Sequence, residues 1–172
     1  NEAKVGTLRG TGRRALIGAL TVLLAVGVSA GSAAAQVPTN DDFNQPRPVP
    51  RSIVNGTGYY DNIDATAQAC EPVHAHRRGG SSVWFKLIGR ATRDRVYVNT
   101  LGADFDSLLA VYYGGQICHV LPIASNDNCP GISGGSSCLS FVALPNTNYR
   151  IAVDGLNGAE GQFHFKVRRV VL

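Results

Sequence analysis

The sequence has few of the residues and spacings from which catalytic and metal sites are commonly built. No two cysteines are spaced C-x-x-C, which argues against zinc and thioredoxin-like sites. After residue 35, glutamate occurs only at Glu71 and Glu160, which argues against the paired carboxylates of a glycoside hydrolase. No segment after residue 35 carries a helical apolar stripe longer than about two turns, which argues against a helical fold.

Residues 1–35 have the three-part layout of a secretory signal. Four basic residues in positions 4–14 precede the uncharged run 15–30, and alanines at 33–35 provide an A-x-A cleavage site before Gln36. The uncharged run spans about 16 residues, whereas a membrane-spanning helix needs roughly 20. We therefore expect a signal helix that is removed on export, with no stable membrane insertion afterwards. A retained anchor is the alternative.

Export also removes most of the net positive charge. Residues 1–35 hold four of the 16 Lys and Arg and one of the 12 Asp and Glu, which leaves 12 basic against 11 acidic residues. A net charge of +1 gives no basis for a nucleic-acid-binding patch. The remaining residues 36–172 suffice for one domain with a hydrophobic core.

All four cysteines follow the signal, and an even number in an exported chain favours disulfides over a metal cluster. Three pairings are open from the sequence. We favour Cys129 with Cys138, which would close the loop CPGISGGSSC, and therefore Cys70 with Cys118.

Short runs rich in Val, Ile, Tyr and Phe alternate with turn residues and predict about eight strands. This pattern favours an all-β, antiparallel sandwich or barrel over residues 52–172. Residues 36–51 contain four prolines, and we interpret them as a linker or an arm along a sheet edge. The expected strands are roughly 52–60, 82–88, 95–101, 107–113, 120–124, 139–144, 149–153 and 162–171.

Two stretches resemble reactive sites but have simpler interpretations. GISGG at 131–135 is similar to the surround of the nucleophile in chymotrypsin-like proteases, which also need an oriented histidine and normally two barrels. We interpret it as a loop tip. His74 and His76 would share a face on a strand and could bind copper or zinc, although a polar loop is the simpler interpretation. Trp84 is expected in the core.

Acidic side chains near strand ends are candidate calcium ligands. Calcium takes about six to eight oxygen ligands, but no cluster here has the EF-hand spacing. The alternative is that these residues cap turns through local backbone hydrogen bonds. For Asp154, which glycines follow, we expect a turn cap. The calcium candidates are Asp104, Asp106, Asp127 and Asp154.

Five stretches occur in an order that resembles one family of exported modules. Together they are similar to the bacterial pre-peptidase C-terminal domain over about residues 40–170. No single motif is diagnostic, and the resemblance depends on the order of all five. The stretches are NDDF (40–43), EPVHAHRRGGSSVWF (71–85), DFDSLLAVYYG (104–114), ASNDNC (124–129) and YRIAVDGLNGAEGQFHF (149–165).

The resemblance implies a jelly-roll-like β-sandwich and a non-catalytic role in secretion, substrate or matrix binding, or adhesion. Some members of the family bind calcium, and the matching motifs imply that Asp106 and Asp127 lie near each other. Asn128 stands where the family commonly has a second acid, which weakens a cation site. Cys70 and the loop from Cys129 to Cys138 are additions to the family pattern.

The sequence thus predicts a non-catalytic module that is secreted or displayed on the cell surface and acts in binding or adhesion. Its partners would be an extracellular protein or polysaccharide, with calcium as the candidate cofactor and no nucleic acid. The first alternative is a structural subunit whose arm, residues 36–51, pairs with the sheet edge of a neighbouring copy to form a polymer. The second is a secreted hydrolase, which would need a convergent acid–base pair in a pocket, such as a deep hollow in which a histidine contacts a hydroxyl or thiol with a carboxylate behind it.

Overall fold

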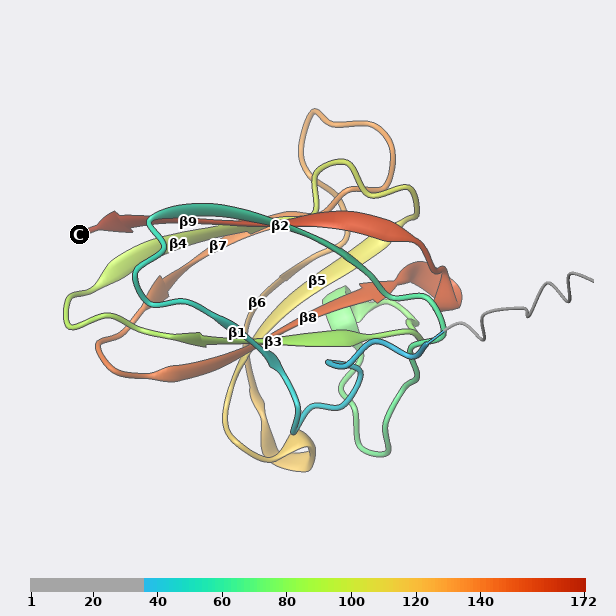
Figure 1. The fold of residues 1–172 in the computed structure, drawn as a ribbon, viewed down its shortest axis with the longest axis horizontal. Helices are drawn as coiled ribbons and strands as arrows, with labels where there is room; N and C mark the ends of the chain where they lie inside the picture. Colours follow the sequence, from blue (N-terminus) through green and yellow to red (C-terminus); the bar gives the residue numbers. More distant parts are fainter. Residues whose placement is uncertain (1–35) are drawn as a thin grey trace, which may run out of the picture. The chain divides into compact units, whose positions relative to one another are not determined.

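The computed structural model describes residues 36–172, which form a nearly all-β unit (Figure 1). The expected signal segment, residues 1–35, lies outside the described residues, so its helix and its cleavage stay predictions. Among the described residues, no helix has both the length and the apolar character that crossing a membrane requires.

Nine strands form in residues 36–172 and fall into two stacked sheets (Figure 1). The five-stranded sheet has the order β1-β3-β8-β5-β6, and the four-stranded sheet has the order β2-β9-β4-β7. Eight strands overlap the eight expected ranges, and β1 is additional. The strands are β1 (Arg47–Val49), β2 (Asn55–Asp61), β3 (Val83–Ile88), β4 (Asp94–Asn99), β5 (Ser107–Tyr113), β6 (Leu121–Asn126), β7 (Cys138–Ala143), β8 (Asn148–Gly155) and β9 (Gln162–Val171).

The strand pairing is nested around the β5–β6 pair. β5 pairs with β6, β4 with β7, β3 with β8 and β2 with β9, all antiparallel. The chain therefore follows the path of one long hairpin that is rolled so that its successive pairs lie in alternate sheets. This is the topology of a jelly roll, and the expected all-β, jelly-roll-like sandwich is confirmed.

The proline-rich arm contributes the one departure from antiparallel pairing among the described strands. β1 pairs in parallel with β3, with Arg47 opposite Phe85 and Val49 opposite Leu87. Pro48 lies in this three-residue edge strand, where the missing N–H costs little because no further strand follows. The arm thus uses, within its own chain, the pairing groups that the polymer hypothesis assigns to a neighbouring copy.

The central strands of the five-stranded sheet are buried on both faces. On its inner face, side chains such as Phe85 and Ile151 pack against the four-stranded sheet. For example, Phe85 stacks on Phe165 of β9. Its outer face carries a second cluster, and the expected core position of Trp84 is confirmed there. The second cluster consists of Phe43, Trp84, Ala110, Tyr112 and Ala152, with Ile117 and Val120 packed against it.

Three segments cover this second cluster, and we refer to them together as the covering layer. They are the arm around Phe43, the short 3-10 helix η1 (His74–His76) and residues 117–120, which include η2 (Ile117–His119). A disulfide joins Cys70 to Cys118 across this layer, and a second joins Cys129 to Cys138. These are the pairs favoured from the sequence.

Candidate functional site

A buried hydrogen-bonded relay lies beneath the covering layer. His74 Nδ1 is 2.8 Å from the Tyr112 hydroxyl, and His74 Nε2 is 2.9 Å from Glu71 Oε1. Both His74 and Tyr112 are buried against Trp84. These contacts fit a histidine that donates from Nε2 to the carboxylate and accepts the tyrosine proton at Nδ1. A histidine that contacts both a hydroxyl and a carboxylate is part of what the hydrolase alternative requires.

The surroundings of the relay do not suit nucleophilic catalysis. An activated nucleophile needs a lowered pKa and access to substrate. Burial instead raises the pKa of the Tyr112 phenol, and the negative charges of Glu71 and Asp154 raise it further. Tyr112 is also only 3% exposed. The relay therefore acts as a satisfied polar network that fixes η1 onto β5, since buried polar groups stabilise a fold when all are paired.

Asp154 does more than cap the turn that follows it. Its carboxylate accepts the backbone N–H of Ser81 at 2.8 Å and that of Gly80 at 3.0 Å, besides that of Gly155 at 2.7 Å. Gly79 packs so closely on the carboxylate that a side chain there would overlap it. The interpretation of Asp154 as only a turn cap was incomplete, because the residue also joins β8 to a segment more than 70 residues earlier.

Glu71, His74 and Asp154 form a group of potential metal ligands, with ligand atoms within 4.8 Å of one another. Each is already engaged in hydrogen bonds: Glu71 Oε2 accepts the Gln68 N–H, and both ring nitrogens of His74 are bonded within the relay. A cation would have to displace these contacts. His76 does not join His74 on a strand, because Ala75 between them has a positive φ of 49° and the residues form η1.

Two of the other calcium candidates already have partners within residues 36–172. Asp127 forms an ion pair with Arg77, and Asp104 accepts the backbone N–H of Gln162. Neither belongs, with Asp106, to any group of three ligand side chains in the described part of the chain. Calcium binding at Asp104, Asp106, Asp127 and Asp154 stays a prediction from the sequence.

The outer face of the four-stranded sheet has no covering layer within residues 36–172, whereas the centre of the other sheet's outer face has one. Alternate residues of β9, such as Phe163 and Phe165, point into the core, so His164, Lys166 and Arg168 point outward. Within residues 55–59, 95–99, 138–142 and 164–168, which make up most of this face, no Asp or Glu occurs. Its charged side chains there are therefore all basic.

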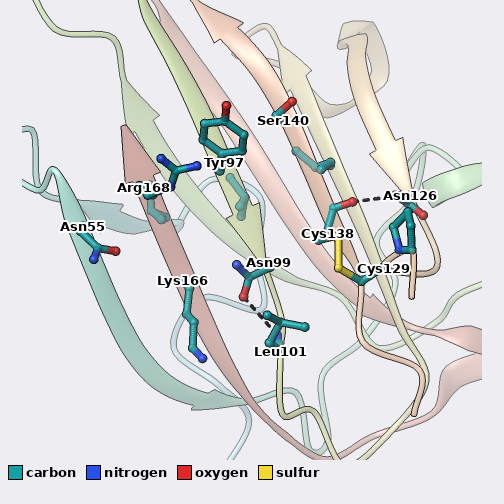
Figure 2. Close-up of a pocket in the computed structure, with 14 residues that line it drawn as sticks. Asn55, Tyr97, Asn99, Leu101, Asn126, Cys129, Cys138, Ser140, Lys166 and Arg168 are labelled. Atoms are coloured by element: carbon teal, nitrogen blue, oxygen red, sulfur yellow. Dashed lines mark hydrogen bonds between the residues drawn. A yellow bond between two sulfur atoms is a disulfide. The ribbon is translucent and has the colours of Figure 1, made fainter. Parts of the chain in front are cut away.

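A groove with a volume of about 530 Å³ crosses this face (Figure 2). Two cross-strand pairs line it, with Tyr97 opposite Arg168 and Asn99 opposite Lys166. The Arg168 guanidinium lies 4.0 Å from the centre of the Tyr97 ring, which is a cation–π contact. The contact holds both side chains next to each other in the lining of the groove. The Cys129–Cys138 disulfide and Pro130 border the groove, so the disulfide-closed loop forms one of its walls.

The groove combines three kinds of contact. Lys166 and Arg168 offer positive charge, and the amides of Asn55, Asn99 and Asn126 offer donors and acceptors, although the Asn126 amide nitrogen also donates to the Cys138 carbonyl. Apolar surface comes from residues such as Val98, Leu101, Pro130, Leu139 and Val167. Sites of this composition bind polar ligands that also carry apolar faces.

Sequence reasoning did not single out the groove residues. The alternation in FHFKVRRV predicts that Lys166 and Arg168 lie on the face opposite Phe165 and Val167, and the structure shows this arrangement. It contains no signal for which of the two sheets keeps an open face, because that depends on where the covering layer packs.

Comparison with known proteins gives a fold-level likeness only. No family model and no curated protein matches the chain, so the resemblance to pre-peptidase C-terminal domains stays a prediction. Among solved structures, one that the chain is similar to is Aeromonas hydrophila PliG, a periplasmic inhibitor of g-type lysozyme. The identity is 15%, the alignment covers 73% of this chain and 96% of that chain, and the TM-score is 0.44.

Proposed function

We propose that the protein is a non-catalytic, exported binding module that holds an acidic polysaccharide in the groove on the outer face of the four-stranded sheet. The observation that carries the proposal is the grouping of Lys166, Arg168 and Tyr97 in one groove, on the sheet face that no segment of residues 36–172 covers.

The three kinds of contact in the groove correspond to the three chemical parts of an acidic sugar chain. Acidic groups pair with ammonium and guanidinium groups, and hydroxyls exchange hydrogen bonds with asparagine amides. The C–H face of a sugar ring packs on aromatic and aliphatic surface. Successive outward side chains of β9 are two residues apart, about 6.6 Å. Lys166 and Arg168 can thus contact separate acidic groups of one extended ligand.

Affinity electrophoresis and calorimetric titration with a panel of acidic and neutral polysaccharides test the proposal. We expect binding to acidic chains that weakens with added salt, because exposed charge pairs are screened. Lys166→Ala and Arg168→Ala should each lower affinity roughly tenfold, as expected for loss of a charge-assisted hydrogen bond. Arg93→Ala is the matched control, because Arg93 is exposed and lies outside the groove.

Two results would contradict the proposal. One is equal binding of neutral and acidic chains that is insensitive to both substitutions. The other is capture of an extracellular protein, blocked by the same substitutions, with no polysaccharide bound. That second result would retain the groove and replace the class of ligand.

A further inference from the structure

The four-stranded sheet ends in a free edge at β2. The Val54 carbonyl accepts the Arg169 N–H, and the Asn62 N–H donates to the Gly161 carbonyl. The backbone N–H and C=O groups of the even-numbered residues of β2 therefore point toward β9. The backbone groups of Asn55, Thr57, Tyr59 and Asp61 therefore point away from the sheet. In residues 36–172 no hydrogen bond involves these outward backbone groups.

Of the other three edge strands, β1 and β6 carry protections against pairing, and β7 is covered at its start. β1 has only three residues, includes Pro48 and is followed directly by Pro50, so both prolines remove N–H groups that another strand could use. β6 contains Pro122, and its register with β5 shifts at Val111 and Tyr112. β7 lies beside β6, where the Asn126 amide donates to the Cys138 carbonyl. Prolines, bulges and covering segments are the usual protections of edge strands.

β2 contains neither a proline nor a bulge. Its seven residues, NGTGYYD, include no proline, lysine or arginine, and its single charge lies at Asp61, the last residue. An exposed strand of this kind is a site for addition of another strand. Within residues 36–172 no strand pairs with this edge, because β1, its nearest neighbour in the chain, pairs in the other sheet. Residues of the arm line cavities beside β2 but form no backbone hydrogen bond with it.

The sequence of β2 is complementary to itself in the antiparallel direction. We propose that the protein forms a symmetric dimer in which β2 pairs with β2 of a second copy around a two-fold axis at Gly58. This register places Thr57 opposite Tyr59 and Asn55 opposite Asp61, so that all the outward backbone groups meet. It also places the bulky Tyr60 opposite Gly56, and the Asn55 amide can donate to the Asp61 carboxylate.

The two-fold axis is perpendicular to the sheet, so pairing joins two four-stranded sheets into one continuous eight-stranded sheet. Both outer faces then lie on the same side. The two β9 strands would be three strand spacings apart, about 14 Å. The dimer would present its two sets of basic residues side by side, and its formation does not depend on which ligand they bind.

Sedimentation equilibrium and amide hydrogen exchange on the purified exported protein test the inference. We expect a monomer–dimer equilibrium, with amides of Asn55, Thr57 and Tyr59 becoming protected as the protein concentration rises. Thr57→Pro removes an outward N–H without touching the β9 ladder, and should shift the protein to monomer. Val142→Pro is the matched control, because residue 142 faces outward on the opposite edge strand, β7, and should leave the dimer intact.

A second variant removes any dependence on how proline affects folding. Thr57→Glu with Tyr59→Glu places acids at two exposed positions of the monomer, but directly opposite one another in the dimer, where like charges repel. We expect this variant to be monomeric and normally folded by circular dichroism. A strictly monomeric native protein at high concentration, or a dimer unchanged by both variants, would overturn the inference.

Discussion

The Arg169 guanidinium lies 3.9 Å from the Asp94 carboxylate, and both side chains are fully buried. Arg90 bonds the same carboxylate through two nitrogens at 2.6 Å each. These hydrogen bonds from Arg90 lower the pKa of Asp94, with burial opposing them and the charges of both arginines adding to them. Arg169 itself has only the Ile88 carbonyl as a close partner, and two of its nitrogens have none.

This asymmetry predicts that substitutions of Asp94 and Arg169 differ in their effect on the free energy of unfolding. Asp94→Asn leaves the buried Arg169 charge uncompensated and should lower the free energy of unfolding by about 3–5 kcal/mol. Arg169→Met removes a poorly satisfied charge while Asp94 keeps Arg90, so its effect should lie within about 1 kcal/mol of zero or be stabilising. Urea unfolding measures both. A loss for Arg169→Met as large as that for Asp94→Asn would contradict this account.

Gly79 should be intolerant of any side chain. A methyl group at residue 79 would overlap the Asp154 carboxylate and displace the segment whose N–H groups bind it. We expect Gly79→Ala to cost about 1–3 kcal/mol of unfolding free energy, as over-packing does. Gly115→Ala is the control, because a side chain there meets nothing within 4 Å. Equal thermal midpoints for the two variants would argue against the close packing.

Phe43 should contribute most of the arm's stabilising effect. It is fully buried, lies edge-on to Trp84 with ring centres 5.0 Å apart and has Arg150 over its ring. Phe43→Ala should lower the free energy of unfolding by about 3–5 kcal/mol. Val37→Ala, at an exposed position of the same arm, should change it by no more than about 0.5 kcal/mol. Similar losses from both would mean that the arm is held by other contacts.

Tyr112 should make stability depend on alkaline pH. Its pKa in the folded state is raised, so its contribution is complete below the unfolded value of about 10 and is lost as pH rises above that value. Tyr112→Phe should cost about 1–2 kcal/mol at neutral pH, because His74 loses a partner. The variant should also lose less stability than the native protein above about pH 10.

Guanidinium unfolding at a series of pH values measures both effects. Tyr113→Phe is the matched control, since Tyr113 is the exposed neighbour on β5. A native protein whose alkaline loss of stability equals that of Tyr112→Phe would contradict the role given to Tyr112.

Local patterns predicted most of the fold, because strands and turns are encoded by nearby residues. The alternation in FHFKVRRV gave both faces of β9, and its continuation even places Arg169 inward, where its charge would not be expected. β1 was missed, because three residues that include a proline give no alternation and are held by pairing with β3.

The polar network could not be derived in the same way. His74 and Tyr112 are 38 residues apart, and Asp154 and Gly80 are 74 apart, so their contacts exist only after the sheets have formed. The sequence identified Asp154 and His74 as residues of interest. It assigned them to a turn and a loop because their partners are distant in the chain.

The Cys70–Cys118 cross-link has a practical consequence for anyone who produces this protein. Both cysteines lie at the surface, within reach of soluble thiols. Material made in a reducing cytoplasm would lack the bond that keeps residues 70 and 118 together, leaving the aromatic surface around Trp84 less securely shielded. Such preparations should bind hydrophobic dyes and aggregate on storage, whereas protein exported to an oxidising compartment should not.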